Sequence, residues 1–559
     1  MELKKFVRSY WFILFIWILI YSWYPLFLGF YLDDWSYIRP ELHPSNFDFF
    51  APNIFNLNFF SLINRPVLGI IFTLCCYIAG NSNPVYWQVI TQIIVLLTAF
   101  SLNYFSIRLF RMLEFKDERK WAVILTGLWL IHPVLLPFVA WPLGSMLILS
   151  PIFSLISFGY LIDGWNKGKK IWLMPLVFYL LACFSYESFY FQFFVIFIIA
   201  YAKGIHKKFG IRYFLSIIFG YFTINLLSIV WNRVSSLFST DIVNKEFNPY
   251  FLQTIAANFF SLPYAYFVVF SWFSVILICF IIYLFIKYRK ATSTHSKPDK
   301  RLNLLIILSL LFGMGISIVI YSGAGYTLWS IGPRARTLAV VNIWFLFLLI
   351  YMVYYIYHHN LFSKTIKILS ILSIAVLVST NLIRANDWIY SWQIQKDIIS
   401  AIPHEKIKQT KEDCVIIFDG PFRHNGVPVI DADWLARPLL NYGIRYLPGK
   451  SFYYIDTSEK RNYLIGRNII HSVFGTNIVF YWDGKVLIKK YDEESSSVKL
   501  AKSNVYNPEE KYATSEVWVW KYETGQFYKV EPPAKLSFEP QMNYDYWLTY
   551  IYLNYIKKK

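Results

Sequence analysis

The chain has 559 residues, of which 57% are hydrophobic, 21% aromatic and only 16% charged, and its formal net charge is +19. A soluble protein usually carries about 25% charged residues and could not hide this much apolar surface from water, so we exclude a soluble globular protein. The positive charge does not indicate a nucleic-acid partner, because the Lys and Arg residues are spread among loops between apolar stretches.

Apolar stretches of about 20 residues, the length that crosses a bilayer as a helix, recur through the first 384 residues. The first runs from about Tyr10 to Phe30 and lacks a small-residue cleavage site, so we predict a retained helix and not a signal peptide. The sequence predicts a polytopic α-helical membrane protein of about eleven transmembrane helices, the others lying near residues 85–108, 121–140, 144–163, 172–186, 187–203, 213–232, 259–286, 303–322, 337–357 and 366–384.

Positive charge predicts the orientation of these spans. The basic loops fall on one side together with the amino terminus, and they hold Arg111 to Lys120, Lys167 to Lys170, Lys203 to Arg212, Lys287 to Arg301, and Lys364. By the positive-inside rule this side is cytoplasmic, so the loops at 31–84, 233–258 and 323–336 face outward. Within the first outer loop, Pro66 to Gly80 spans only about 15 apolar residues, which favours a re-entrant or interfacial helix.

Beyond Ala385 the pattern changes to short β-type runs separated by Asp, Gly and Asn. These runs are Cys414 to Phe418, Ile478 to Trp482, and Val517 to Trp520. We therefore predict two domains, a transmembrane domain over 1–384 and an extracytoplasmic α/β or α+β domain over 385–559.

Two adjacent acids, Asp33 and Asp34, follow the first predicted span in the segment FYLDDWSYI. Carboxylates at a membrane boundary are costly to desolvate, so a pair placed there suggests a function. A solvated loop after a helix also carries acids for no special reason, and the pair alone leaves both interpretations open.

Four further segments follow the acid pair: NRPVLGI at 64–70, NPVY at 83–86, IHPVLLPFVAW at 131–141 and SYES at 185–188. In order and spacing, these five segments resemble the GT-C membrane glycosyltransferases, in particular the branch similar to protein O-mannosyltransferases. That branch has DD, RP-L, NP-x-Y, HPV-x-x-x-x-VAW and S-K-E elements in this order. Here Pro137 replaces an acid of the family, Tyr186 replaces the Lys of S-K-E, and the tetratricopeptide repeats of the animal enzymes are absent, which leaves the acceptor class open.

The resemblance implies an inverting glycosyltransferase that moves a sugar from a polyprenyl-phosphate donor to a glycan, lipid or protein acceptor outside the membrane. It implies that Asp33 is the base that removes the acceptor's proton, while Asp34 orients the acceptor, the base or a metal. In the segment GPRART, Arg334 and Arg336 lie where the family has an Arg-containing outer loop, and their guanidinium groups could bind the leaving phosphate. Two carboxylates and a phosphate would also suit Mg²⁺ or Mn²⁺, and we leave open whether a metal is bound.

Three other ionisable residues are candidates for the site because such residues are rare among lipid-facing neighbours. Arg65 would face the acceptor, the donor phosphate or a lipid headgroup, and Glu187 lies near an outer helix junction. His132 precedes Pro133, so we favour a structural role at a kink over a role in the site.

Two other classes of protein stay open. An envelope polysaccharide polymerase or ligase would also act outside on lipid-linked sugars, and a transporter or flippase for such lipids would have a similar number of spans. Transporters usually consist of two related halves with broken segments at mid-membrane, and the sequence has no convincing internal repeat. For each class we expect a multi-pass protein of a bacterial plasma membrane with a cytoplasmic amino terminus.

Overall fold

The structure is a computed structural model that describes residues 2–31, 34, 64–80, 83–236, 251–252, 255–256, 258–259, 282–284, 286, 297–323, 336–358, 364–401, 406, 415–419, 423–424, 427–429, 478–491 and 509–538. These residues belong to two compact units. The boundary between the units lies after Ala385, within the long helix Lys364–Ser400. The first unit is helical. The second holds the described strands and the end of that long helix, together with Tyr31 and Asp34.

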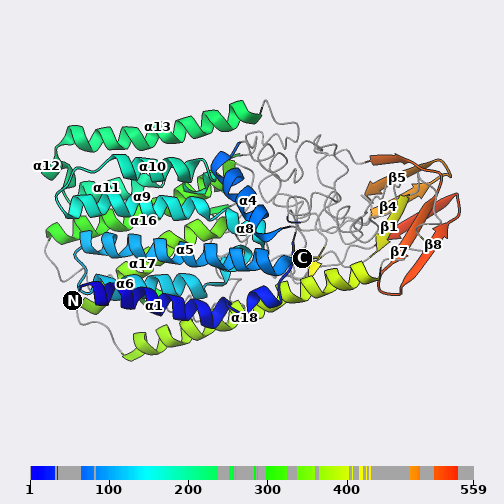
Figure 1. Ribbon diagram of the computed structural model, residues 1–559, viewed down its shortest axis with the longest axis horizontal. Helices are drawn as coiled ribbons and strands as arrows, with labels where there is room; N and C mark the ends of the chain where they lie inside the picture. The colour runs from blue at the N-terminus through cyan, green and yellow to red at the C-terminus, as the bar shows by residue number, and fades with distance from the viewer. Residues whose placement is uncertain are drawn as a thin grey trace, which may run out of the picture. The chain divides into compact units, whose positions relative to one another are not determined.

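The helices of the first unit run alongside one another as a bundle, with short breaks between several of them (Figure 1). Its α-helices are α1 (Glu2–Tyr21), α4 (Pro66–Ala79), α5 (Pro84–Met112), α6 (Glu118–Ile131), α7 (Leu136–Ala140), α8 (Pro142–Met146), α9 (Leu149–Asn166), α10 (Leu173–Cys183), α11 (Phe193–Ala202), α12 (Ile205–Phe209), α13 (Ile211–Ser236), α16 (Lys297–Gly323), α17 (Arg336–His358) and α18 (Lys364–Ser400), which ends in the second unit. Three 3-10 turns join them: η1 (Tyr24–Leu26), η3 (Pro133–Leu135) and η4 (Glu187–Phe189).

Among the described residues, six helices are long and apolar enough to cross a membrane, or seven if one bent pair counts as a span. This is consistent with an integral membrane protein. Three other predicted spans coincide with shorter apolar helices, and the span predicted at 259–286 lies mostly outside the described residues. The total of eleven therefore stays a prediction. The six long helices cover Pro84–Met112, Pro142–Asn166, Ile211–Ser235, Arg301–Gly323, Arg336–His358 and Ile366–Ile398.

The outer helices leave large apolar side chains uncovered. On α13 the side chain of Phe219 is 70% exposed, and on α18 that of Ile371 is 67% exposed, whereas the side chains of Leu155 and Phe158 on α9 are fully buried. Such faces would be unfavourable in water but suit the hydrocarbon of a bilayer. The pattern indicates that α9 lies at the centre of the described bundle and that the exposed apolar faces of α13 and α18 are suited to contact with lipid.

The span predicted at 121–140 is not straight. Helix α6 ends at Ile131, and the chain bends by 62° into the segment 133–140. A broken helix leaves carbonyl groups without partners, which is costly away from water, so neighbouring side chains must supply donors. The donors come from three other helices. The Tyr21 hydroxyl donates to Leu130 O, and Asn381 Nδ2 donates to Ile131 O (3.3 Å). From α5, Gln92 Nε2 donates to Val139 O (2.9 Å), and Gln88 Nε2 donates to Ala140 O (2.7 Å) and also to Gly29 O (2.8 Å), which lies outside the broken span.

The basic loops meet at one end of the bundle. Lys203 forms an ion pair with Glu114 (2.8 Å), and the backbone N–H of Lys116 donates to the Tyr354 hydroxyl (2.9 Å). The hydroxyl of Tyr213 donates to the carbonyl of Ile171 (3.0 Å), and this hydrogen bond connects the loop at 167–171 to α13. Helix α12 marks this end, and α4 and α8 lie at the opposite one (Figure 1). The loops 111–120, 167–170 and 203–212, which the sequence places on one side of the membrane, thus lie at the same end of the bundle.

The described residues of the second unit form two small sheets and a two-stranded ribbon. In the first sheet, β1 (Val415–Asp419) pairs in parallel with β7 (Val517–Lys521), which pairs in antiparallel with β8 (Gln526–Val530). The second sheet is antiparallel and has the order β6 (Glu509–Ala513), β5 (Val486–Tyr491), β4 (Ile478–Trp482) and β9 (Ala534–Phe538). The ribbon pairs β2 (Arg423–His424) with β3 (Val427–Pro428).

Buried side chains from both sheets form one core, which includes Ile417, Phe480 and Val519. The three predicted β-type runs coincide with β1, β4 and β7, so the prediction of a small sheet-containing region is confirmed. The helix predicted to end at 384 instead continues as α18 to Ser400.

Candidate functional site

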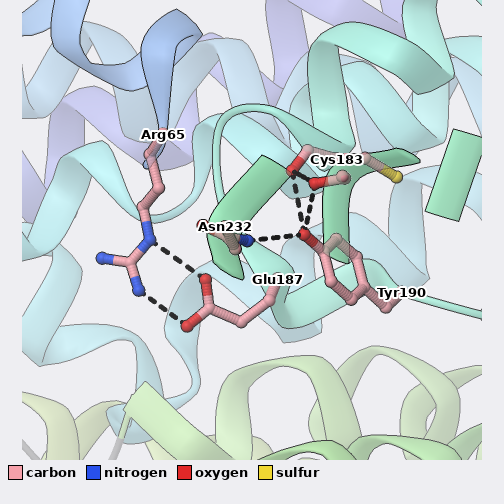
Figure 2. Close-up of polar contacts among 6 residues, drawn as sticks. Arg65, Cys183, Glu187, Tyr190 and Asn232 are labelled. Atoms are coloured by element: carbon pink, nitrogen blue, oxygen red, sulfur yellow. Dashed lines mark hydrogen bonds and ion pairs between the residues drawn. The ribbon is translucent and has the colours of Figure 1, made fainter. Parts of the chain in front are cut away.

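The irregular segment between α10 and α11 lies at the end of the bundle that holds α4 and α8. It contains the turn η4, and Phe191 adopts a φ of 61°, a conformation that residues other than glycine rarely adopt. Side chains of α13 hold this backbone in place. The amide oxygen of Asn225 accepts the N–H of Phe191 (3.2 Å). Asn232 Nδ2 donates to the Tyr190 hydroxyl (3.2 Å; Figure 2).

Arg65 and Glu187 form a two-pronged ion pair beside this segment (Figure 2). Arg65 Nη2 lies 2.7 Å from Glu187 Oε1 and Nε lies 3.1 Å from Oε2, the forked geometry in which Arg–carboxylate hydrogen bonds are strongest. The guanidinium carbon also lies 4.4 Å from the ring centre of Tyr186. The charge of Arg65 is therefore compensated, and the pair attaches the start of α4 to η4.

A pocket opens next to η4 within the same unit. Its volume, including space open to solvent, is about 370 Å³, and most of its wall is apolar. The polar groups at the wall belong to Tyr186, Ser188, Tyr321 and Arg336. Ser188 is 3% exposed, and its hydroxyl has no hydrogen-bond partner among the described residues.

Arg336 is the first residue of α17, and its guanidinium carbon lies 5.2 Å from the ring centre of Trp141. The amino terminus of a helix carries partial positive charge and N–H groups without intrahelical partners. A guanidinium group at that position adds a full charge and forked donors. The combination suits an anion such as a phosphate group.

The structure brings three of the predicted site residues to this end of the bundle: Arg65, Glu187 and Arg336. His132 is also buried in the first unit, and its Nδ1 accepts the N–H of Val134 (3.3 Å), so it caps the turn η3. The His132 side chain thus satisfies a backbone N–H group at the kink.

Asp34 lies in the second unit and is fully buried. Its Oδ2 accepts the N–H of Tyr31 (2.9 Å), while its own N–H donates to the carbonyl of Tyr31 (3.0 Å). Asp33 and Arg334 lie outside the described residues. Within the part of the chain that the structure describes, no three His, Cys, Asp or Glu side chains gather to hold a metal ion.

The pocket also contains residues to which the sequence assigned no role. Tyr186 and Ser188 belong to the SYES segment and Phe138 belongs to the IHPVLLPFVAW segment, so the sequence marked the segments but not the roles of these residues. Tyr321 sits near the end of α16, where no motif marks it. No protein-family model and no curated protein matches this chain, so its function is inferred from the pocket and its chemistry.

Proposed function

We propose that the chain is a GT-C-type inverting glycosyltransferase that takes a sugar from a polyprenyl-phosphate donor and transfers it to an acceptor on the extracytoplasmic side of the membrane. One observation carries the proposal. Segments that are far apart in sequence, around Phe138, Tyr186 and Arg336, line one pocket in an apolar helix bundle, and the Arg65–Glu187 ion pair lies beside Tyr186.

The chemistry of the pocket supports this assignment. Transfer of the sugar leaves negative charge on the polyprenyl phosphate, and a cation fixed in a partly desolvated site stabilises such charge strongly. Arg336 fills that role in the proposal because it lines the pocket at the first residue of α17. The apolar outer helices give the polyprenyl chain a hydrocarbon environment beside the bundle.

The acid pair completes the proposal. Asp33 would remove the proton of the acceptor hydroxyl as that oxygen attacks the anomeric carbon, and Asp34 would orient the acceptor or the base. The basic loops gather at the opposite end from α4 and η4, so the positive-inside rule supports an extracytoplasmic pocket.

The test uses the full-length protein in nanodiscs and a panel of synthetic polyprenyl-phosphate hexoses and pentoses. Release of free polyprenyl phosphate is measured by mass spectrometry, since this reports donor consumption whatever the acceptor. We expect turnover of at least one donor by the wild type, no turnover by Asp33→Asn, and a loss of about tenfold to a hundredfold for Arg336→Gln.

Two variants serve as comparisons. Arg336→Lys keeps the charge but loses the fork, so its activity should be intermediate. Arg111→Gln removes an exposed arginine that pairs with Glu118 at the opposite end of the bundle, and its activity should equal that of the wild type. The absence of turnover with every donor, or full activity of Asp33→Asn, would refute the proposal.

A further inference from the structure

The end of the bundle that carries the basic loops holds a group of cations without acidic partners. Lys167 and Lys203 at this end are neutralised by ion pairs with Asp163 and Glu114. Within the part of the chain that the structure describes, five other exposed cations form no ion pair, and we call them the cationic cluster: Lys169, Lys170, Lys207, Lys208 and Arg212.

The sequence explains why the cluster is not neutralised. Between Asp163 and Asp241 the only acidic residue is Glu187, which is paired with Arg65 beside α4 at the opposite end of the bundle. The loop at 111–120 lies at the same end as the cluster, yet it contains three acids beside its four cations. The excess of positive charge therefore belongs to the loops around α10, α12 and α13 and not to the whole end of the bundle.

Packing brings the two halves of the cluster together. The Tyr213 hydroxyl donates to the carbonyl of Ile171 (3.0 Å), which attaches the loop before α10 to the start of α13. The rings of Tyr213 and Phe209 lie 5.8 Å apart, with Lys170 Nζ 5.7 Å from the first ring centre and Lys208 Nζ 5.5 Å from the second. Contacts of an exposed ammonium group with a neutral ring are weak and leave its charge uncompensated.

The helices that begin at the cluster expose apolar side chains. Trp172 and Leu173, at the start of α10, are 58% and 57% exposed, and Leu215 and Phe219 on α13 are also exposed. The two helices pack closely, since a Cβ added at Gly220 would lie 3.1 Å from the side chain of Leu176. Uncompensated cations thus stand directly beside an apolar surface suited to lipid, with a Trp at the boundary, where this residue is enriched in membrane proteins.

This combination determines the kind of partner. A phospholipid with a net negative headgroup matches the cations with its headgroup and the apolar side chains with its acyl chains. A soluble anion would use only the cations, and a zwitterionic phospholipid would gain little from them. We propose that the cationic cluster binds the headgroup of an anionic phospholipid whose acyl chains lie along α10 and α13. The proposal is independent of the proposed function, because the pocket lies elsewhere in the bundle.

The experiment uses the full-length protein in phosphatidylcholine nanodiscs that contain a small fraction of a photoreactive lipid with a diazirine in its acyl chain. The probe is either phosphatidylglycerol or phosphatidylcholine, and mass spectrometry measures the labelling of peptides that cover residues 171–180 and 211–219. The wild type should favour the phosphatidylglycerol probe in both segments. A lysine near an anionic headgroup is worth about fivefold in affinity, so Lys169→Gln/Lys170→Gln should lower the ratio of the two labelling yields by about tenfold to 25-fold.

Two further variants separate the cluster from net charge. Lys116→Gln/Lys120→Gln removes two exposed lysines from the loop at 111–120, and the ratio should stay within about twofold of the wild type. Lys169→Arg/Lys170→Arg keeps the charge and should keep the ratio. If Lys169→Gln/Lys170→Gln does not fold, Lys207→Gln/Lys208→Gln removes the same charge from the other half of the cluster.

Four outcomes would overturn the inference. These are equal labelling of the wild type by the two probes, an unchanged ratio after the cluster lysines are replaced, an equal loss in Lys116→Gln/Lys120→Gln, and full displacement of the phosphatidylglycerol probe by inorganic phosphate. The last would show a site for small anions and not for a lipid. None of these outcomes bears on donor turnover, so the proposed function would stand or fall by its own test.

Discussion

The pairing of Arg65 with Glu187 allows a quantitative prediction. Its two hydrogen bonds measure 2.7 and 3.1 Å, and the two side chains are 16% and 20% exposed. Exposed pairs contribute about 0.2–1 kcal/mol, and removing one partner of a buried pair costs about 3–5 kcal/mol. The partial exposure places this pair between the two limits, so Glu187→Met should lower the free energy of unfolding by about 2 kcal/mol.

Arg65→Met should cost about 1 kcal/mol more than Glu187→Met, because it also removes the contact between the guanidinium group and Tyr186. The double variant should be more stable than the sum of the two losses predicts, by a coupling energy of about 1.5 kcal/mol. Arg65→Lys should keep only part of this coupling, since an ammonium group cannot form the fork.

The assay is unfolding of the full-length protein by SDS in mixed micelles, followed by far-UV circular dichroism, for the wild type and each variant. A coupling energy below about 0.5 kcal/mol would show that solvent screens the pair and that it does not hold η4.

Three further changes test other parts of the fold. Gly159→Ala on α9 should destabilise the bundle by about 1–3 kcal/mol in the same unfolding assay, because its Cβ would lie 2.3 Å from the ring of Tyr104 on α5. Gln88→Met leaves two buried carbonyl groups without donors and Gln92→Met leaves one, so the first should cost about 2–4 kcal/mol and the second about half of that; equal costs would contradict the capping argument. The backbone N–H groups of Val486 and Lys485 lower the pKa of Asp483 below its ordinary value, so the ionised carboxylate stabilises the β4–β5 turn above that value and this contribution is lost as the pH falls through the lowered pKa. The protection factors of the amides across residues 478–491, which are the intrinsic exchange rates at each pH divided by the observed rates, should fall on acidification in the wild type and fall less in Asp483→Asn.

Hydropathy predicted where the long helices lie, because length and apolar content are local properties of the chain. It did not predict the bend of 62° in the span at 121–140. Pro133 marks the position, but a proline alone does not decide between a mild kink and a break. The outcome depends on donors that arrive from elsewhere, such as Asn381 on α18, and sequence patterns within the span carry no information about them.

The candidate site, too, could be predicted only where local sequence was sufficient. Arg65, Glu187 and Arg336 were identifiable from the segments that contain them, but the pairing of two of them was not. These two residues lie 122 positions apart, and only the packing of α4 against the turn η4 decides that Arg65 meets a carboxylate.

The cap on α6 has a consequence for biosynthesis. Asn381 binds the carbonyl of Ile131, 250 positions earlier, and the hydroxyl of Tyr21, 360 positions earlier. During translation, the first helix and the broken span are therefore in the membrane long before the residue that joins them has been made. Until then, water, lipid headgroups or the insertion machinery must satisfy these groups. The native arrangement of α1 and α6 is thus completed late, after most of the bundle has left the ribosome.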